Sequence, residues 1–357
     1  MWSQAQPREI AFEPWPSNGI ERVSRCLICG VEDRSILHEG LWDNTFFAAA
    51  DRWTLWRCAG CRSAYLDPRP DRATIALAYS RYYTHANQDS PRDTRKSIRA
   101  ALANGYRNAR YGTKFEPSLS IGQYVALALP GFRRALHWHY RYLPKPRGTS
   151  RGRALDIGTG NGGWLLIAAE AGWSVAGADP DPVARTKGDE LGLEIRHGGA
   201  EAWADEPGTF DFISMNHVIE HVHDPAQTLR TVFELLRPGG RLFIQTPNLD
   251  ALGHSIYGRN WRGLEPPRHL VLFNRRSLAH ALRSQGFVNV RYRRITSVFR
   301  SFNMMSIRMV HGLDPYDDSQ DDKLPAPSMK DRIRGIFTSE RSEFLTLTCE
   351  IPGKDAS

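Results

Sequence analysis

LDIGTGNGG, residues 155–163, is the stretch that decides the fold. It completes RALDIG, which reads as a buried strand beginning at Arg153, and the apolar helical segment WLLIAAEAG follows it. Glycines at a strand-to-helix turn let the backbone approach a ligand closely and leave amide N–H groups exposed where the helix begins. The stretch therefore predicts the first strand of a parallel α/β sheet, with a ligand-binding turn at its carboxyl end.

The residues after this turn repeat the pattern of a strand followed by a helix. Further strands are expected at SVAGADP, LEIRHG, FDFISMNHV and RLFIQTP, each bounded by helical or turn-rich segments. The final two strands, VNVRYRRIT and EFLTLTCEIP, are separated by an irregular polar insertion, residues 297–341, without an obvious crossover helix. The sequence thus predicts an α/β fold with a Rossmann-like, mostly parallel sheet and an antiparallel last strand.

The overall composition is that of a globular protein. Of the 357 residues, 41% are hydrophobic and 24% are charged. No apolar run has the roughly 18 residues that a membrane helix needs. The N-terminus lacks the basic start and apolar segment of a secretory signal. A cytoplasmic protein without a transmembrane segment is therefore expected.

Four of the five cysteines form two Cys-x2-Cys pairs, CLICG at 26–30 and CAGC at 58–61. In a cytoplasmic protein, such pairs favour a metal over disulfides. Four thiolates on two tight turns form a closed tetrahedral shell, which suits zinc and leaves no position for a substrate water. A structural zinc ion is predicted, although a zinc ribbon can also bind nucleic acid. Its expected ligands are Cys26, Cys29, Cys58 and Cys61.

Positive charge is concentrated in one part of the chain. Residues 91–153 contain 14 Lys and Arg against 2 acidic residues, so the remainder is net acidic although the whole chain carries +8. Solvated helix faces explain many such runs. Three units are predicted: a zinc-ribbon-like domain at 1–83, a basic helical connector at 84–150 that ends in the linker KPRGTSRG, and a ligand-binding α/β domain at 151–357.

Two cofactors compete for the glycine turn. Gly158-x-Gly160-x-x-Gly163 satisfies the dinucleotide fingerprint, which by itself is weak evidence for NAD. Asp156, two residues before the first glycine, would repel a pyrophosphate but would attract an ammonium group. Asp179, at the end of the second strand, would accept hydrogen bonds from the ribose hydroxyls of either cofactor. Asp156 therefore favours S-adenosylmethionine, and an NAD-dependent oxidoreductase stays as an alternative.

Several motifs together carry a family resemblance: LDIGTGNGGWL, GADPD, FDFISMNHVIEHVHDP, LLRPGGRLFIQTPN and PPRHLVLFN. From about residue 152 to 351 the chain resembles a class I S-adenosylmethionine-dependent methyltransferase of type 23, similar to ubiquinone-biosynthesis O-methyltransferases. The N-terminal part, with CLICG and WRCAGCRSAYLDPRP, resembles the zinc-binding segment that precedes many such enzymes. Arg62 departs from that pattern, because those segments usually have glycine after the fourth cysteine.

The resemblance assigns roles to residues at the ends of four strands. It implies that Asp156, Gly158 and Gly160 line the methionine part of the cofactor and that Asp179 binds the ribose. It places Ala200 and Glu201 beside the adenine. The residues expected to flank the sulfonium are Asn216 and His217.

An acceptor pocket is expected after the fifth strand, at NWRGLEPPRHLVLF, residues 260–273. His269 is the predicted general base, with His217 as a second catalytic candidate; His269 could instead cap the following segment. Related enzymes hold a divalent metal with Glu-x-x-Glu-His, whereas this chain has His217, Glu220 and His221, a set less suited to magnesium. Those side chains could instead pack where the next helix begins. The predicted substrate contacts are Trp261, Arg262 and Arg268.

The predicted function is O-methylation of a small molecule, a saccharide or a secondary metabolite. Arginines of the basic segment are expected to recognise a phosphate on a nucleotide-linked or carrier-linked acceptor. An alternative is a methyltransferase that binds nucleic acid through the ribbon and the basic segment. The residues Asn216-His217-Val218-Ile219 argue against it, because they replace the Asn/Asp-Pro-Pro-Tyr/Phe motif of base amino methylation. The sequence predicts no particular oligomeric state.

Overall fold

The computed structural model describes residues 14–48, 50–80, 97–144, 152–294, 299–325, 328 and 339–353. The predicted linker, apart from Gly152, and both predicted domain boundaries lie outside the described residues. None of the described helices combines the length and the hydropathy that a membrane crossing requires.

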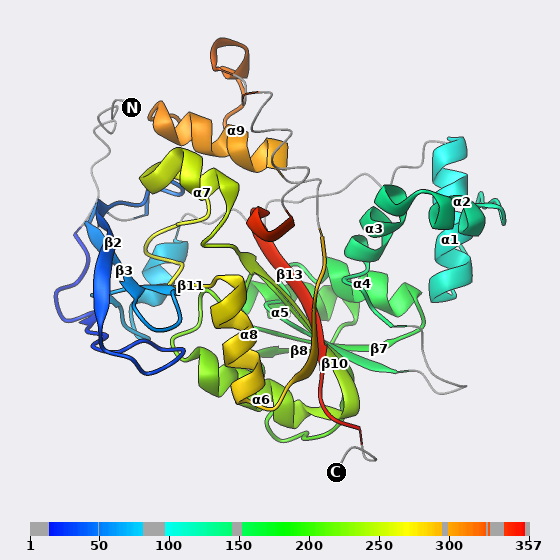
Figure 1. Ribbon diagram of the computed structural model, residues 1–357. Helices are drawn as coiled ribbons and strands as arrows, with labels where there is room; N and C mark the ends of the chain where they lie inside the picture. Colours follow the sequence, from blue (N-terminus) through cyan, green and yellow to red (C-terminus); the bar gives the residue numbers. More distant parts are fainter. Residues whose placement is uncertain are drawn as a thin grey trace.

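A seven-stranded sheet forms the centre of the molecule (Figure 1), in the order β12-β13-β10-β9-β6-β7-β8. The strands from β10 to β8 are parallel, and β13 runs antiparallel to both of its neighbours. The predicted sheet is confirmed, but the last strand inserts between β10 and β12. The strands are β6 (Arg153–Ile157), β7 (Ser174–Asp179), β8 (Ile195–His197), β9 (Phe210–Asn216), β10 (Leu236–Pro247), β12 (Val288–Tyr292) and β13 (Phe344–Glu350).

Helices cover both faces of this sheet because alternate strand residues point to opposite sides. Leu155 and Ile157 belong to a core that also holds α6 (Pro225–Leu235) and α8 (Arg275–Ser284). Ala154 belongs to a second core, shared with α4 and the helices before β6. The remaining helices of the sheet and connector are α1 (Ile98–Tyr111), α2 (Gly122–Ala128), α3 (Pro130–His139), α4 (Gly163–Glu170), α5 (Pro182–Leu191) and η2 (Ala200–Trp203).

A smaller antiparallel sheet, in the order β11-β4-β3-β2, lies on the opposite side of the molecule from α1, α2 and α3 (Figure 1). Three strands come from the N-terminal region, but β11 belongs to the stretch 260–273. That stretch therefore joins the N-terminal sheet to the large sheet. The elements are β1 (Ile20–Glu21), β2 (Arg34–Leu41), β3 (Trp53–Cys58), β4 (Ala64–Leu66), β5 (Arg69–Pro70), η1 (Ile75–Tyr79) and β11 (Val271–Leu272).

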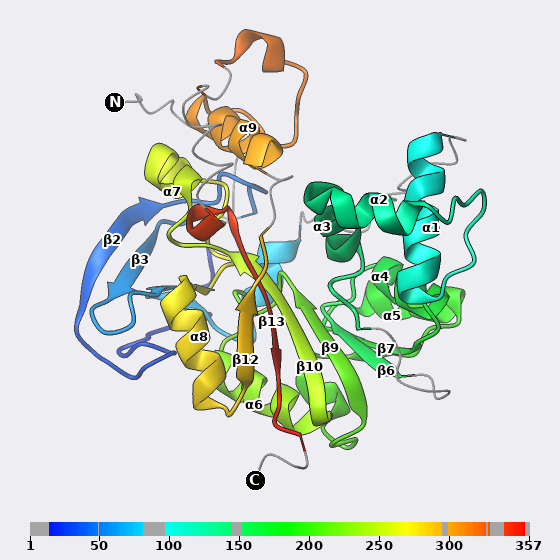
Figure 2. The same ribbon diagram turned by 45° about the vertical axis from the view of Figure 1, so that its right-hand side comes forward.

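The insertion between the last two strands was predicted to be irregular, and in part this is wrong. It contains α9 (Phe299–Val310), which lies above α7 in both views (Figure 2). Asn303 and Ser306 are buried in α9 beside Ile307. Polar residues on the buried side weaken the apolar period from which a helix is recognised. The other elements nearby are α7 (Leu252–Tyr257), η3 (Gly258–Asn260), η4 (Asp321–Lys323) and η5 (Ser339–Arg341).

Candidate active site at the carboxyl edge of the sheet

The glycine turn lies where the strand order reverses, between β6 and β9, which is where open α/β sheets bind their ligands. Gly158 and Gly160 both have positive φ, 71° and 58°. A Cβ at Gly158 would lie 2.4 Å from a Val218 methyl carbon, so this glycine is required for packing. A Cβ at Gly160 would meet no atom within 4 Å, which leaves this part of the turn open to a ligand.

Asp156 is fully buried behind the turn. One carboxylate oxygen accepts a hydrogen bond from Arg141, which also donates to Ser214 Oγ at 2.7 Å. The other oxygen, Oδ2, has no hydrogen-bond partner among the described residues. Burial raises the pKa of Asp156 to about 6, although Arg141 opposes this shift. A buried carboxylate oxygen without a partner fits the ammonium group of an S-adenosylmethionine bound at this turn.

Arg141 was not predicted as a site residue. It follows α3 with a φ of 48°, and its guanidinium lies 4.8 Å from the centre of the Trp164 ring. No feature of the segment ALHWHYRYLP distinguishes it from the other arginines of the connector. Only the tertiary fold brings Arg141 to Asp156.

Asp179 supports the turn from the end of β7. Its Oδ2 accepts a hydrogen bond from Gly160 N at 2.8 Å, and its Oδ1 accepts one from Asp181 N at 2.9 Å. The carboxylate is therefore held beside the ligand side of the turn. Whether it binds a ribose remains a prediction.

The other predicted cofactor residues lie along the same edge. Ala200 is buried at the start of η2, and the Glu201 carboxylate accepts a hydrogen bond from Gly199 N at 2.7 Å. Asn216 is the last residue of β9. These positions agree with the order of strands that the prediction assumed, but the adenine and sulfonium contacts themselves are untested.

His217 follows β9 with a φ of 57°. Its Nδ1 lies 3.2 Å from Glu220 Oε1, and its ring packs edge-on against Phe344 at a centroid distance of 4.7 Å. About a third of the side chain is exposed, at 35%. His217 therefore reaches solvent at the carboxyl edge and also orients Glu220.

Three potential metal ligands converge beside it. Glu220, His221 and His269 each offer one ligand atom, and these atoms all lie within 4.8 Å of one another. Glu220 is fully buried, and its Oε2 has no hydrogen-bond partner among the described residues. We call Glu220, His221 and His269 the edge triad.

A hydrogen bond fixes the tautomer of His269. Its Nδ1 lies 2.9 Å from the Gly263 carbonyl oxygen, which accepts only, so Nδ1 carries the proton and Nε2 keeps a lone pair. His221 Nδ1 lies 3.0 Å from both the Arg268 carbonyl oxygen and the Tyr79 hydroxyl, and the hydroxyl can either donate or accept. Burial lowers the pKa of His269 to about 4, which keeps its ring neutral and leaves Nε2 available to a metal.

The edge triad fits a transition metal better than magnesium. Two imidazoles and one carboxylate suit zinc or iron, and the carbonyl contacts at Nδ1 are those that usually orient metal-binding histidines. The set differs from the one considered from the sequence. His217 contacts Glu220 instead of completing the cluster, and the third ligand comes from His269, 48 residues after His221 in the chain.

The predicted substrate residues of the loop are buried. Trp261 is 0% exposed and donates from Nε1 to Glu343 Oε2 at 2.6 Å. Arg262 pairs with Glu265 and donates to the Tyr316 hydroxyl oxygen at 2.5 Å. Their predicted contact with substrate is untested, and the observed contacts show that they hold the loop in place.

Arg268 is also fully buried, and it links the loop to the N-terminal region. It donates to both carboxylate oxygens of Asp43, at 2.8 and 3.2 Å, to Glu265 Oε1 at 2.9 Å and to the Ala78 carbonyl oxygen at 2.8 Å. These acceptors fix the position of the residue next to His269. Its role as a substrate contact likewise stays a prediction.

The four predicted zinc ligands come together in the N-terminal region. The Sγ atoms of Cys26, Cys29, Cys58 and Cys61 all lie within 4.8 Å of one another. Gly30 and Arg62 follow the second cysteine of each pair, with φ of 73° and 65°. Arg62 thus adopts the left-handed conformation for which glycine is favoured, so the departure from the usual sequence does not change the turn.

The family comparison agrees with this geometry. Residues 130–292 match the family model described as a methyltransferase domain. The five parallel strands, β12 and the open glycine turn lie within that segment, whereas β13 lies outside it. Residues 130–292 therefore resemble a methyltransferase domain.

Relatives of the methyltransferase domain include two ubiquinone biosynthesis O-methyltransferases. The protein from Ruegeria pomeroyi is 43% identical over 110 residues, which cover 29% of this chain and 44% of that protein. The protein from Pseudomonas aeruginosa strain LESB58 is 37% identical over 114 residues, 30% of this chain and 49% of that protein. The chain therefore spans less than half the length of either relative.

Among solved structures, phosphoethanolamine N-methyltransferase 2 from Haemonchus contortus aligns with a TM-score of 0.43 at 15% identity, covering 82% of this chain and 63% of that one. A methyltransferase from Archaeoglobus fulgidus aligns with a TM-score of 0.41 at 16% identity, covering 61% of this chain and 92% of that one.

Proposed function

We propose that this protein is an S-adenosylmethionine-dependent methyltransferase that transfers a methyl group to a hydroxyl of a small molecule. The observation that carries the proposal is the buried, unpartnered Oδ2 of Asp156 behind the open glycine turn, inside a methyltransferase domain. A pyrophosphate would be repelled at this place, so the same observation counts against the dinucleotide alternative.

The chain's part in catalysis is mainly to align two ligands. S-adenosylmethionine supplies a methyl group on a sulfonium, a good leaving group, and alignment alone can lower such a barrier by roughly 7 to 11 kcal/mol. Asp156 would bind the ammonium group, Asp179 the ribose, and Ala200 and Glu201 would border the adenine. Asn216 and His217 would flank the reacting centre.

The edge triad would act on the acceptor hydroxyl. In the metal-free site, the Nε2 of His269 would receive the hydroxyl proton, a step worth about 10² to 10⁴ in rate. If the three groups hold a zinc or iron ion, that lone pair is bound to the metal, and the ion would act as the Lewis acid for that oxygen in place of a histidine base. His217 would keep Glu220 oriented. The cysteine cluster, in contrast, would hold a structural zinc ion.

Two classes of acceptor deserve a direct comparison. The sequence favours a saccharide or a secondary metabolite, whereas the relatives favour a ubiquinone precursor because they act in ubiquinone biosynthesis. The aligned segments cover less than half of each relative. We therefore propose O-methylation of a small molecule, and the acceptor assay includes compounds of both classes. The cytoplasmic location expected from the sequence stays a prediction.

The cofactor part is tested by calorimetry with S-adenosylhomocysteine. Asp156→Asn is expected to weaken binding about 10- to 100-fold, because a hydrogen bond to a charged group contributes about 1.5 to 3 kcal/mol. Asp189→Asn, which changes an exposed carboxylate on α5, is the matched control and should leave binding unchanged. If both variants lose affinity for S-adenosylhomocysteine equally, Asp156 does not bind the cofactor.

The acceptor part is tested with labelled S-adenosylmethionine. Wild-type protein is incubated with saccharides, nucleotide-linked sugars, ubiquinone precursors and an extract of the source cells, and the labelled product is identified. Label on an oxygen of a small molecule supports the proposal. Label on nucleic acid would replace it with the alternative from the sequence. Absence of both cofactor binding and transfer would refute it, and binding of NAD instead would restore the oxidoreductase alternative.

A further inference from the structure

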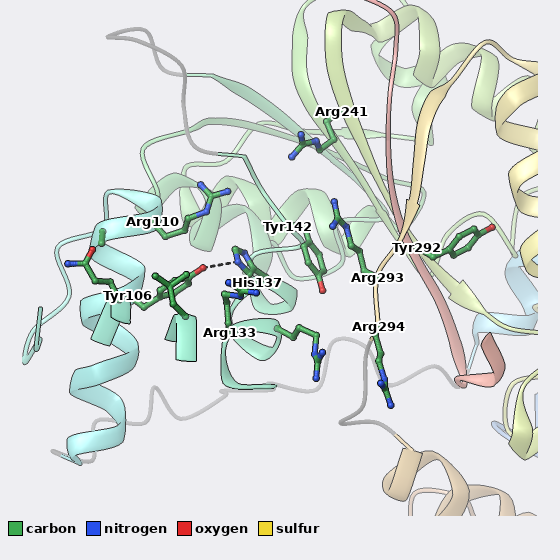
Figure 3. Close-up of a pocket in the computed structure, with 13 residues that line it drawn as sticks. Tyr106, Arg110, Arg133, His137, Tyr142, Arg241, Tyr292, Arg293 and Arg294 are labelled. Atoms are coloured by element: carbon green, nitrogen blue, oxygen red, sulfur yellow. Dashed lines mark hydrogen bonds between the residues drawn. The ribbon is translucent and has the colours of Figure 1, made fainter. Parts of the chain in front are cut away.

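A pocket of about 670 Å³ lies between the connector helices and the edge of the large sheet. Its 13 lining residues include six arginines and no carboxylate. Arg110, Arg133 and Arg134 come from α1 and α3. Arg241 comes from β10, and Arg293 and Arg294 directly follow β12 (Figure 3). Neither the predicted site residues nor the edge triad line it.

The positive charge of this pocket is poorly balanced. Arg241 pairs with Glu350 at 2.7 Å, and within the described ranges the other five arginines show no carboxylate partner. Arg293 instead donates to the Thr348 hydroxyl at 3.0 Å and lies 5.1 Å from the centre of the Tyr142 ring. Arg134 Nε is buried without a hydrogen-bond partner among the described residues.

The histidine that lines the pocket is held by two tyrosines and is neutral. His137 has both ring nitrogens within 2.7 Å of tyrosine hydroxyls, from Tyr106 and Tyr111. Burial, followed by the charges of Arg110 and Arg133, lowers the pKa of His137 to about 4. His137 therefore adds no positive charge, and the six arginines without a lining carboxylate give the pocket a net positive charge that favours an anion.

The pocket is adjacent to the cofactor residues. Tyr142, in its wall, directly follows Arg141, which holds Asp156. Arg293 N donates to the Thr346 carbonyl oxygen at 2.7 Å, and Thr346 and Asn216 both pair with Gln245. The Arg293 end of the pocket is therefore level with Asn216, at the carboxyl edge of the sheet. A molecule anchored in the pocket could extend to that edge.

We propose that this arginine pocket binds the phosphate or diphosphate group of a phosphorylated small-molecule acceptor. Guanidinium groups match phosphate oxygens in a bidentate manner, and several such groups without carboxylates favour an anion of more than one charge. The volume suits a ligand of nucleotide size. This inference rests on the proposed methyltransferase function, because it specifies the acceptor of the same site.

The test is calorimetry of the full chain with inorganic pyrophosphate, with uridine diphosphate and with vesicles that contain phosphatidic acid. Arg133→Gln and Arg293→Gln are each expected to weaken phosphate binding at least tenfold and to leave the Kd for S-adenosylhomocysteine unchanged. Arg230→Gln, an exposed arginine on α6, is the control and should change neither. Melting temperatures of all variants verify that they are folded.

The outcomes separate the two proposals. Binding of uridine diphosphate supports a soluble acceptor, and binding of the vesicles alone supports a phosphate on a lipid. If S-adenosylhomocysteine binds but no phosphate compound does, or if Arg230→Gln weakens phosphate binding equally, the pocket inference is wrong and the function stands. Failure of S-adenosylhomocysteine binding overturns both. Binding of an RNA oligonucleotide that pyrophosphate cannot displace would overturn the assignment to a small-molecule acceptor.

Discussion

Replacing Arg268 with methionine gives the sharpest test of how the loop is held. The side chain is 0% exposed, and so is its partner Asp43. Breaking a buried ion pair from one side costs about 3 to 5 kcal/mol, because the other charge stays buried without its partner. Asp43 would keep hydrogen bonds from the backbone N–H groups of Thr45, Phe46 and Ala48. We therefore expect a loss near the lower end, about 3 kcal/mol.

The loss is measured as the free energy of unfolding in urea. The control is Arg276→Met, which changes an exposed arginine on α8. It should change the free energy of unfolding by no more than about 0.5 kcal/mol. Combining Arg268→Met with Asp43→Asn should recover at least about 1 kcal/mol, because the unpaired charge is removed. A loss below about 1 kcal/mol for Arg268→Met, or strict additivity in the double variant, would refute the reasoning.

Three other predictions follow from the site. Because the pKa of Asp156 is raised to about 6, protonation below that pH removes the charge that attracts the ammonium group of the ligand. The Kd for S-adenosylhomocysteine, measured from pH 8 to pH 5, should therefore be constant above pH 7 and should rise by up to about tenfold per pH unit below pH 6. Arg62→Gly should stabilise the metal-loaded protein against thermal unfolding by about 1 kcal/mol, because glycine adopts the left-handed backbone conformation without strain. Gly30→Ala should destabilise it for the opposite reason. The opposite signs would contradict the assignment of the two turns. Native mass spectrometry of the zinc-loaded protein should show two metal ions. Cys61→Ser should lose the ion of the cysteine cluster, and His269→Ala should lose the ion of the edge triad. If both variants keep two ions, Cys61 and His269 are not metal ligands.

The parts of the fold that local sequence dictates were predicted well. The strands at RALDI and FDFIS are rich in apolar residues and almost entirely buried because both faces of the sheet are covered, and such segments are visible in the chain. The glycine turn was visible for a similar reason, since only glycine readily adopts the φ values found at Gly158 and Gly160. The helix α9 was missed because its buried side includes Asn303 and Ser306.

The candidate site was predicted in outline. Asp156, Asp179 and Asn216 lie at or next to the carboxyl ends of neighbouring strands, so their proximity follows from the topology alone. The cysteine pairs likewise identify themselves by spacing, and the structure brings their sulfur atoms together. The third member of the edge triad could not be foreseen, because His269 reaches Glu220 only through the path of a loop between two sheets.

The sequence by itself determined the class of fold, the ligand-binding turn and the cysteine cluster, because each depends on residues close together in the chain. Tertiary structure alone decided that Arg141 reaches Asp156, that Arg268 is fully buried against Asp43, and that six arginines from distant elements face one pocket. These outcomes depend on how separate elements pack, since a buried charge is stable only beside a partner that another part of the chain supplies.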